Sequence, residues 1–471
     1  MAACNESKFC DQYMLLKPED ASLFGLVWYL LFSTSNTSGH GFIQCKEEPK
    51  LEGFWRRWYI FISLFAQKLL LYLGNPMDKI GKMLELGLNL LSNVLKGNFV
   101  WPNRSSAKFT SVVGNLDQRV ELDKNIRPSD PKYNASLAMM ASKLAYENEA
   151  FIQKTVRDHW SMEYLGFDNF FWNDYLEQPS TKAMMFQDTR AQPNLIVVAF
   201  KGTNPFDPVA LRTDVDLSWI EIKGVGNVHS GFMKALGLQK DDKGWPKEIQ
   251  QGSKQFAYYV IRQRLRDLLK ENKSAKFILT GHSLGGALAV LFVTVLAIHE
   301  ETWLLDRLEG VYTFGQPRVG NKQLGDYMKE KMDKYDVKYL RYVYCNDMMP
   351  RIPYDDEANL FFEHWGPCVY YNSFYEGEVR SVEPNKNYFS LKWSIPKSLN
   401  ATWELVRSLI IPYARGREYK ESWLMTIIRL VGLVIPGVAA HCPQDYVNAT
   451  RMGSLPLDLL NPIHQRDIKI D

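Results

Sequence analysis

A G-x-S-x-G motif restricts the fold of this 471-residue chain more than any other feature. Gly281, Ser283 and Gly285 lie between an apolar run at residues 276–280 (KFILT) and a helical run at residues 286–298 (GALAVLFVTVLAI). In a nucleophile elbow, a strand turns sharply into a helix, and small neighbours leave room for the turn. The motif therefore predicts a strand, a tight turn and a helix, with the Ser283 hydroxyl placed for chemistry.

Apolar or β-branched runs alternate with helical stretches along the second part of the chain. The expected strands are residues 194–200, 276–280, 310–314 and 338–344, and the expected helices include residues 255–269 and 284–299. Such alternation predicts an α/β fold with a largely parallel sheet covered by helices. A sizeable core is available, because 46% of the residues are hydrophobic and 23% are charged.

Charge and cysteine content exclude several classes of function. Lys and Arg number 56 against 53 Asp and Glu, so the formal net charge of +3 indicates no nucleic-acid partner. The six cysteines are scattered without a C-x-x-C pair or a histidine at zinc-ligand spacing. We therefore expect no metal site and no dense disulfide framework, and a reducing compartment fits best. Residues 1–20 lack the features of a cleaved signal peptide, and we expect none.

The N-terminal region, residues 1–125, is rich in apolar and aromatic side chains. Residues 23–32 and 58–66 are strongly apolar, but each uncharged core is about half the ~20 residues that span a bilayer, so we expect neither to span one. From Pro76, a natural first helical residue, apolar residues recur at helical spacing. The pattern predicts a helical, apolar appendage to a main domain at residues 126–471. It either packs on that domain or lies on a lipid surface, and its aromatic residues favour the lipid surface.

A serine hydroxyl becomes a nucleophile when an imidazole accepts its proton and a carboxylate orients that imidazole. In hydrolases with an elbow, the acid and then the histidine follow the serine in the sequence. Asp347 lies just beyond the strand expected at residues 338–344, where loops at the carboxyl ends of strands carry chemistry. The alternative for Asp347 is an exposed turn aspartate that caps a helix.

Four histidines follow Ser283 in the sequence. His299 lies ~24 Å along the helix that leaves the elbow and cannot fold back onto it. His464 lies in a polar tail, where a solvated side chain is expected. His364 and His441 both remain physically possible, and the loop around His441 slightly favours that residue.

The same chemistry requires donors for the negative charge that develops on the carbonyl oxygen, each contributing ~3–4 kcal/mol. The Leu284 N–H is one donor by the geometry of an elbow. A second is offered by Thr203, in a tight turn after the strand expected at residues 194–200. This chemistry needs no metal and no organic cofactor.

Residues 281–289 (GHSLGGALA) are followed downstream by residues 313–321 (TFGQPRVGN). Together these segments closely resemble the class 3 lipase family, fungal-type triacylglycerol lipases of the α/β-hydrolase fold. Residues 199–203 (AFKGT) resemble the family's oxyanion strand, and residues 229–232 (HSGF) resemble its H-x-G-F segment. The resemblance covers roughly residues 130–450 and implies the same fold and a serine, histidine and aspartate mechanism.

The resemblance also assigns roles to single residues. Thr203 takes the oxyanion role, and Asp347, followed by two prolines, loosely resembles the family's acid loop. His441, with Tyr446 five residues on, resembles the closing H-x-x-x-x-Y motif of the catalytic histidine. His364 resembles a noncatalytic H-x-G strand. These matches favour Ser283, Asp347 and His441 as the catalytic residues.

This chain departs from the family pattern at two points. Lys201 stands where arginine is usual, and an insertion at about residues 370–440 separates the acid from the histidine. The insertion contains an apolar run at residues 423–440, expected either as a buried core helix or as a flap that contacts lipid. Residues 204–212 occupy the place of the family's lid, and their two prolines favour a loop over a long helix.

Within the family, the long chain with apolar N-terminal segments is similar to plant oil-body lipases, which act on stored triacylglycerol at lipid droplets. The resemblance implies an interfacial carboxylester hydrolase, associated with the cytosolic face of the droplet or a membrane, that releases fatty acids from triacylglycerol. One alternative is a phospholipase or galactolipase A1 that acts on membrane lipids. Another is a non-catalytic lipid-surface protein.

Overall fold

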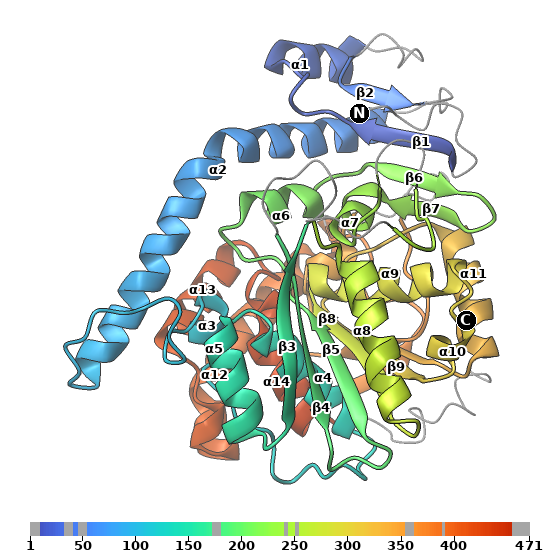
Figure 1. Ribbon diagram of the computed structural model, residues 1–471. Coiled ribbons are helices and arrows are strands. Elements are labelled where there is room, and N and C mark those ends of the chain that lie inside the picture. Colours follow the sequence, from blue (N-terminus) through green and yellow to red (C-terminus); the bar gives the residue numbers. More distant parts are fainter. Residues whose placement is uncertain are drawn as a thin grey trace.

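An eight-stranded sheet runs through the centre of the computed structural model, in the order β12-β11-β10-β9-β8-β5-β4-β3 (Figure 1). The structure describes residues 10–32, 41–45, 54–171, 180–239, 244–249, 254–353, 362–388 and 391–454. The strands of this sheet are β3 (Glu163–Phe170), β4 (Thr181–Asp188), β5 (Leu195–Phe200), β8 (Lys276–His282), β9 (Leu308–Phe314), β10 (Lys338–Tyr344), β11 (Cys368–Tyr371) and β12 (Gly377–Arg380). Strands β5, β8, β9, β10 and β11 are parallel, and antiparallel strands close both edges. The α/β-hydrolase prediction of a mostly parallel sheet is confirmed.

Helices cover both faces of this sheet. One face packs against α8 (Ala257–Glu271), α9 (Leu284–Ile298) and α11 (Lys322–Lys334), and the other against α4 (Tyr133–Leu144) and α14 (Pro443–Met452). Side chains of β8 alternate between the two cores: Phe277 and Leu279 join the first, and Ile278 joins the second. A strand buried on both faces is apolar throughout, which is why the central strands were visible in the sequence.

The N-terminal region contributes strands as well as helices. β1 (Cys10–Leu16) pairs with β2 (Ile43–Cys45) and with β6 (Trp219–Ile222), which pairs in turn with β7 (Gly226–His229). These four strands form a second, smaller sheet. α1 (Leu23–Phe32) packs beside it against α2. The sequence predicted only helices for this region, because β1 and β2 are short and the other partner of β1, β6, lies some 200 residues further along the chain.

α2 (Phe54–Leu95) is one continuous helix of 42 residues with Pro76 inside it. The prediction that a helix begins at Pro76 is therefore wrong, because the apolar segment before it continues into the same helix. A proline inside a helix removes one backbone hydrogen bond and bends the axis, and Figure 1 shows α2 bent over the domain. Among the described helices, α2 is long and apolar enough to cross a membrane by length and composition.

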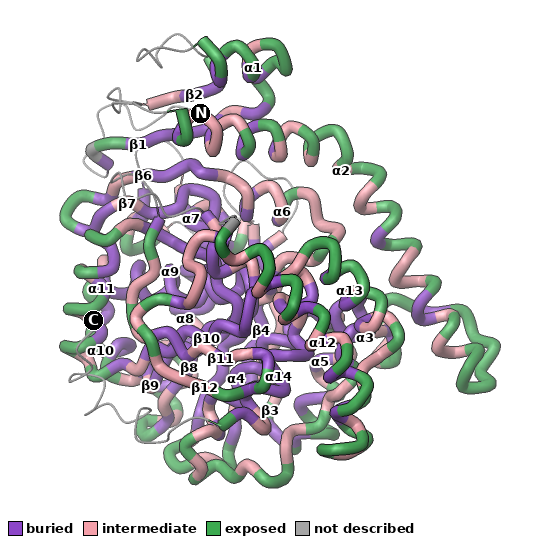
Figure 2. Tube along the Cα trace, turned by 180° about the vertical axis from the view of Figure 1, so that it is seen from behind, coloured by how far each residue is buried: buried purple, intermediate pink, exposed green. Residues whose placement is uncertain are grey.

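Seven further α-helices are described. They are α3 (Val112–Leu116), α5 (Glu149–Lys154), α6 (Pro208–Asp214), α7 (Ser230–Ala235), α10 (Thr302–Leu305), α12 (Ser394–Arg415) and α13 (Trp423–Val434). Within the expected insertion, β12 belongs to the central sheet, and α12 packs against α13. α13 buries Met425, Arg429 and Gly432 and exposes apolar residues such as Leu430 and Val434. It is thus not the buried core helix of the first alternative (Figure 2).

Candidate active site

Ser283 lies at the sharp turn between β8 and α9, as the elbow motif predicts. Its backbone adopts φ 58° and ψ −132°, a conformation that side-chain-bearing residues rarely take and that clusters at functional sites. The turn is crowded: a Cβ at Gly281 would lie 2.0 Å from the Gly285 carbonyl carbon, and one at Gly285 would lie 2.2 Å from the Phe200 carbonyl oxygen. Glycine at both positions is therefore what lets the helix start directly against β5.

His441 and Asp347 meet across 94 residues of sequence. The Nδ1 of His441 lies 2.9 Å from Oδ2 and 3.0 Å from Oδ1 of Asp347. Asp347 follows β10 and is fully buried, whereas His441 ends the 3-10 turn Ala439–His441 with its side chain 22% exposed. Because the carboxylate accepts the Nδ1 proton, the Nε2 atom of His441 remains available as a base.

Gly315 leaves the space in which the Asp347 and His441 side chains meet. It has a positive φ of 59°, and a Cβ there would lie 2.7 Å from Asp347 Oδ2 and 3.0 Å from His441 Nδ1. The Ser283 N–H donates to the carbonyl oxygen of Phe314, the preceding residue, at 2.9 Å. Among the described residues, Ser283 Oγ makes no hydrogen bond to the His441 ring, a contact that often tightens only when substrate binds. Ser283 is 2% exposed, so substrate needs an opening above it.

Two further donors hold the Asp347 carboxylate in place. The Tyr446 hydroxyl donates to Oδ2 at 2.5 Å, and the Met349 N–H donates to Oδ1 at 2.9 Å. Burial raises the pKa of Tyr446 well above its ordinary value, and the charge of Asp347 raises it further. The phenol therefore stays protonated and keeps its hydrogen bond to the carboxylate.

His282 also shapes the site, and the sequence analysis missed it. Its ring lies 4.6 Å from that of His441, and its Nε2 donates to the His441 carbonyl oxygen at 2.8 Å. Its Nδ1 accepts from the Tyr146 hydroxyl at 2.9 Å. Burial lowers the pKa of His282 well below its ordinary value, and His441 lowers it further. This neutral histidine fixes the turn that carries His441, and only its position inside the elbow motif could have drawn attention to it.

Thr203 occupies the turn after β5, beside the elbow. A Cβ at the preceding Gly202 would lie 2.3 Å from the His282 carbonyl oxygen, so this turn packs directly on the strand that ends at Ser283. The Leu284 N–H is the first of α9, where N–H groups have no partner within the helix. Thr203 and Leu284 therefore lie at neighbouring segments that both abut Ser283.

A buried carboxylate, Asp214, accepts the hydroxyl proton of Thr203. Thr203 Oγ1 donates to Asp214 Oδ2 at 2.7 Å, and Oδ1 of the same carboxylate has no hydrogen-bond partner among the described residues. Burial raises the pKa of Asp214 to about 7, although the Thr203 bond and the nearby His441 oppose that rise. No sequence motif identifies Asp214, because only the folded structure shows that it bonds to Thr203.

Asp214 ends α6, two residues beyond the segment 204–212 in which the resemblance predicted a lid. The sequence favoured a loop there, and the structure shows a loop only at the start, followed by the short helix α6. Pro208 occupies the first turn of α6, where a missing N–H is tolerated, and the Asp207 side chain caps that turn.

The other candidate histidines lie elsewhere. His364 is half-buried, and its Nε2 donates to the Pro350 carbonyl oxygen at 2.6 Å. His299 bonds to the Tyr258 hydroxyl and the Trp245 carbonyl oxygen at the far end of α9. His464 lies outside the described residues. Within the described ranges, no group of three His, Cys, Asp or Glu side chains could hold a metal ion.

A buried charge network attaches the insertion to the helix that follows His441. Arg429 of α13 bonds to Glu421 at 2.6 Å and to Asp445 at 3.1 Å, and Arg407 of α12 bonds to Asp445 at 2.7 Å. Asp445 belongs to α14 and directly precedes Tyr446. The insertion is thus bonded to the helix that carries Tyr446, the donor to Asp347.

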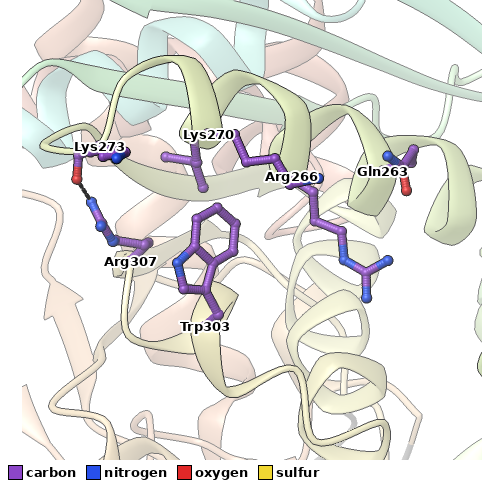
Figure 3. A pocket seen from close by; sticks show the side chains of 7 residues that line it. Gln263, Arg266, Lys270, Lys273, Trp303 and Arg307 are labelled. Carbon is purple, nitrogen blue, oxygen red and sulfur yellow. Dashed lines mark hydrogen bonds between the residues drawn. The ribbon is translucent and has the colours of Figure 1, made fainter.

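A surface hollow of about 560 Å³ lies between α8 and α10 (Figure 3). It is lined by Gln263, Arg266, Leu269, Lys270, Lys273, Trp303 and Arg307. The hollow adjoins the carboxyl end of α9, whereas Ser283 precedes the amino end. The 15 residues of α9 separate them by about 22 Å along the helix axis. The hollow therefore belongs to another part of the surface.

Comparison with known proteins identifies one family and several similar chains. The profile of the family described as lipase (class 3) matches residues 197–357. The triacylglycerol lipase OBL1 of Nicotiana tabacum is 39% identical over 89% of this chain and 86% of that protein. The protein of the same name from Ricinus communis is 34% identical over 96% of this chain and 98% of its own.

A solved structure of the Rhizomucor miehei lipase propeptide complex covers 53% of this chain and 70% of that chain, with 23% identity and a TM-score of 0.36. The identity to the two plant proteins extends over most of their length and most of this chain. The chain belongs to the class 3 lipase family.

Proposed function

We propose that the protein hydrolyses carboxylester bonds of triacylglycerol at the surface of lipid droplets. The observation that carries this proposal is the His441 and Asp347 pair held against the elbow of Ser283. Membership of a lipase family and relatives named triacylglycerol lipase support the substrate class.

In the proposed mechanism, Ser283 Oγ attacks the acyl carbonyl carbon while His441 Nε2 accepts the hydroxyl proton. The Asp347 carboxylate stabilises the imidazolium that results. The carbon–oxygen bond of the ester then breaks, and His441 gives its proton to the departing glyceride oxygen. Water attacks the acyl-enzyme by the reverse path, which releases the fatty acid and restores Ser283.

Charge on the carbonyl oxygen is stabilised in this mechanism by the Leu284 N–H and by Thr203. The hydroxyl of Thr203 has a single proton, which an ionised Asp214 accepts. A protonated Asp214 can instead donate to Thr203 Oγ1, and the threonine proton then becomes available to the substrate oxygen. The raised pKa of Asp214, about 7, makes that protonated form accessible near neutral pH.

Adsorption to lipid is assigned to apolar faces that the structure leaves uncovered. On α2 the exposed apolar residues include Trp55, Ile62, Phe65, Leu69, Tyr72 and Leu73, and on α13 they include Trp423, Ile427, Leu430 and Val434. We call these two sets the outer apolar faces of α2 and α13. Contiguous apolar surface of this kind marks a contact site, and bulky aromatic residues suit a lipid interface. The oil-body lipase name of the plant relatives supports droplet location.

The test compares the wild-type enzyme with Ser283→Ala on emulsified triolein, phosphatidylcholine and a galactolipid. We expect fatty acid release from triolein to exceed release from the polar lipids, and Ser283→Ala to abolish it. A clear preference for a polar lipid would identify an A1-type esterase instead. Undiminished release by Ser283→Ala would overturn the mechanism, and a protein that lacks any esterase burst would be a non-catalytic lipid-surface protein.

A further inference from the structure

The face of α2 opposite to its outer apolar face rests on the segment that links Thr203 to Asp214. α2 packs against α6, and Figure 1 shows it passing above that helix. At Gly81 a Cβ would lie 2.4 Å from the Phe206 Cβ, closer than real Cβ atoms come. The absence of a side chain at Gly81 is therefore what allows α2 to touch the beginning of this segment.

α2 also bonds to the other end of the segment. The Ser63 hydroxyl donates to the Val215 carbonyl oxygen at 2.7 Å, and Gln67 Nε2 donates to Asp216 Oδ1 at 3.3 Å. Val215 and Asp216 directly follow Asp214. α2 thus contacts the chain a few residues after Thr203 and again immediately after the carboxylate that accepts the Thr203 hydroxyl.

α2 also affects the charge of Lys201, which lies at the amino end of the turn that carries Thr203. Burial lowers the pKa of Lys201 to about 8, nearby Lys182 lowers it further, and the carboxylates of Glu85 and Asp207 oppose the change. Glu85 belongs to α2, and Asp207 belongs to the segment. A carboxylate of α2 therefore acts on the ammonium group two residues before Thr203.

We propose that α2 is a positioning element for the oxyanion hole. Ser63, Gln67 and Gly81 share one helix face, because their spacings of four and fourteen residues are near whole helical turns. This inner face holds residues 204–216 so that Asp214 stays against Thr203. The inference rests on the role proposed above for Thr203. The outer face of the same helix is apolar and is assigned to contact with lipid. A lipid surface that displaces α2 therefore also displaces residues 204–216 and changes the geometry of the oxyanion hole.

The experiment compares Gly81→Ala with Gly87→Ala on a water-soluble ester, p-nitrophenyl butyrate, without any lipid surface. Both substitutions add one methyl group to α2 and bring the same gain in helix propensity. Gly87 is exposed, and a Cβ there meets no atom within 4 Å. We expect Gly81→Ala to lower kcat by about tenfold or more, with KM changed less than about twofold, and Gly87→Ala to match the wild type.

Titration of active sites with an organophosphonate counts folded enzyme, so that a loss of stability is not read as a loss of kcat. The double variant Gly81→Ala/Phe206→Gly removes the overlapping pair of Cβ atoms and should recover most of the lost kcat. Equal kcat for Gly81→Ala and Gly87→Ala would overturn the proposal, as would a loss seen only on emulsified triolein. Hydrolysis of the soluble ester by Ser283→Ala would overturn the proposed function instead.

Discussion

The surroundings of His441 and the outer faces of α2 and α13 are built in opposite ways. Around His441, each polar group of Asp347, Tyr446 and His282 has a short hydrogen bond, and the side chains are buried. On the outer apolar faces, the large apolar residues are 42–83% exposed, and Figure 2 colours such residues green along both helices. The difference indicates that chemistry and adsorption to lipid depend on separate residues, which substitutions can separate.

The largest expected effect comes from His441→Ala. Loss of the base should lower kcat by about 10⁴-fold or more on the soluble ester and on emulsified triolein alike. Flotation with lipid droplets should be unchanged, because His441 is not part of an outer apolar face. A residual kcat within about tenfold of the wild type would remove His441 from the mechanism.

Two acidic substitutions on α13 test the other region. Leu430 is 50% exposed and Val434 is 83% exposed, so Leu430→Glu/Val434→Glu should fold normally and lose apolar contact with lipid. We expect about a 100-fold lower rate on emulsified triolein and an unchanged rate on the soluble ester. Gln263→Glu/Gln323→Glu adds the same charge at exposed sites on α8 and α11 and should alter neither rate. An equal loss on both substrates would mean that α13 supports the catalytic residues rather than binding lipid.

Tyr446→Phe sharpens the comparison within the buried region. It removes the hydroxyl that donates to Asp347 and leaves the bond from His441 in place. We expect kcat to fall by about tenfold, as befits a hydrogen bond to a charged group. Tyr413→Phe is the matched control, since the Tyr413 side chain is 92% exposed. If both variants have wild-type kcat, the phenol of Tyr446 has no part in holding the acid.

The smallest expected effect concerns pH and Asp214. Its folded pKa of about 7 is raised above its ordinary 3.8, so this group's stabilising effect is full below about pH 4 and is lost as pH rises through 7. The same rise in pH removes the proton that lets Thr203 donate to substrate. The amide of Asp214→Asn can donate to Thr203 at every pH.

The kcat of Asp214→Asn relative to the wild type should therefore rise about threefold between pH 6 and pH 8.5. Over the range from about pH 4 to 7, the wild type should lose free energy of unfolding relative to the variant. Rate profiles on the soluble ester and urea unfolding at each pH measure the two effects. Parallel rate profiles would contradict the proton exchange between Asp214 and Thr203.

The central strands and the elbow could be predicted from the sequence because their determinants are local. β5 is a continuous apolar run, and β8, β9 and β10 are mostly apolar or aromatic. The glycines beside Ser283 are required by the close contacts of the turn itself. The proximity of Asp347 and His441 followed from motifs, although 94 residues separate them. Their catalytic roles stay predictions that the substitutions above test.

Features that depend on distant partners were not predictable in this way. β1 is a mixed polar and apolar segment that becomes a strand by pairing with β2 and with the distant β6. Pro76 has the usual signature of a helix start, but tertiary packing on both sides continues α2 through it. Asp214 carries no local signal, and the elbow motif contains His282 without giving it a role. Their roles depend on the groups that they bond to in the fold, the Thr203 hydroxyl and the His441 carbonyl oxygen.

The charge network of Arg407, Arg429 and Asp445 has a consequence for heat inactivation. Separating α12 and α13 from α14 would leave buried ions without counter-charges, which is far less favourable than keeping them together. The peripheral helices therefore cannot melt ahead of the catalytic centre. Enzyme warmed slowly should lose esterase turnover and ellipticity in a single cooperative transition, with no partly melted yet active species.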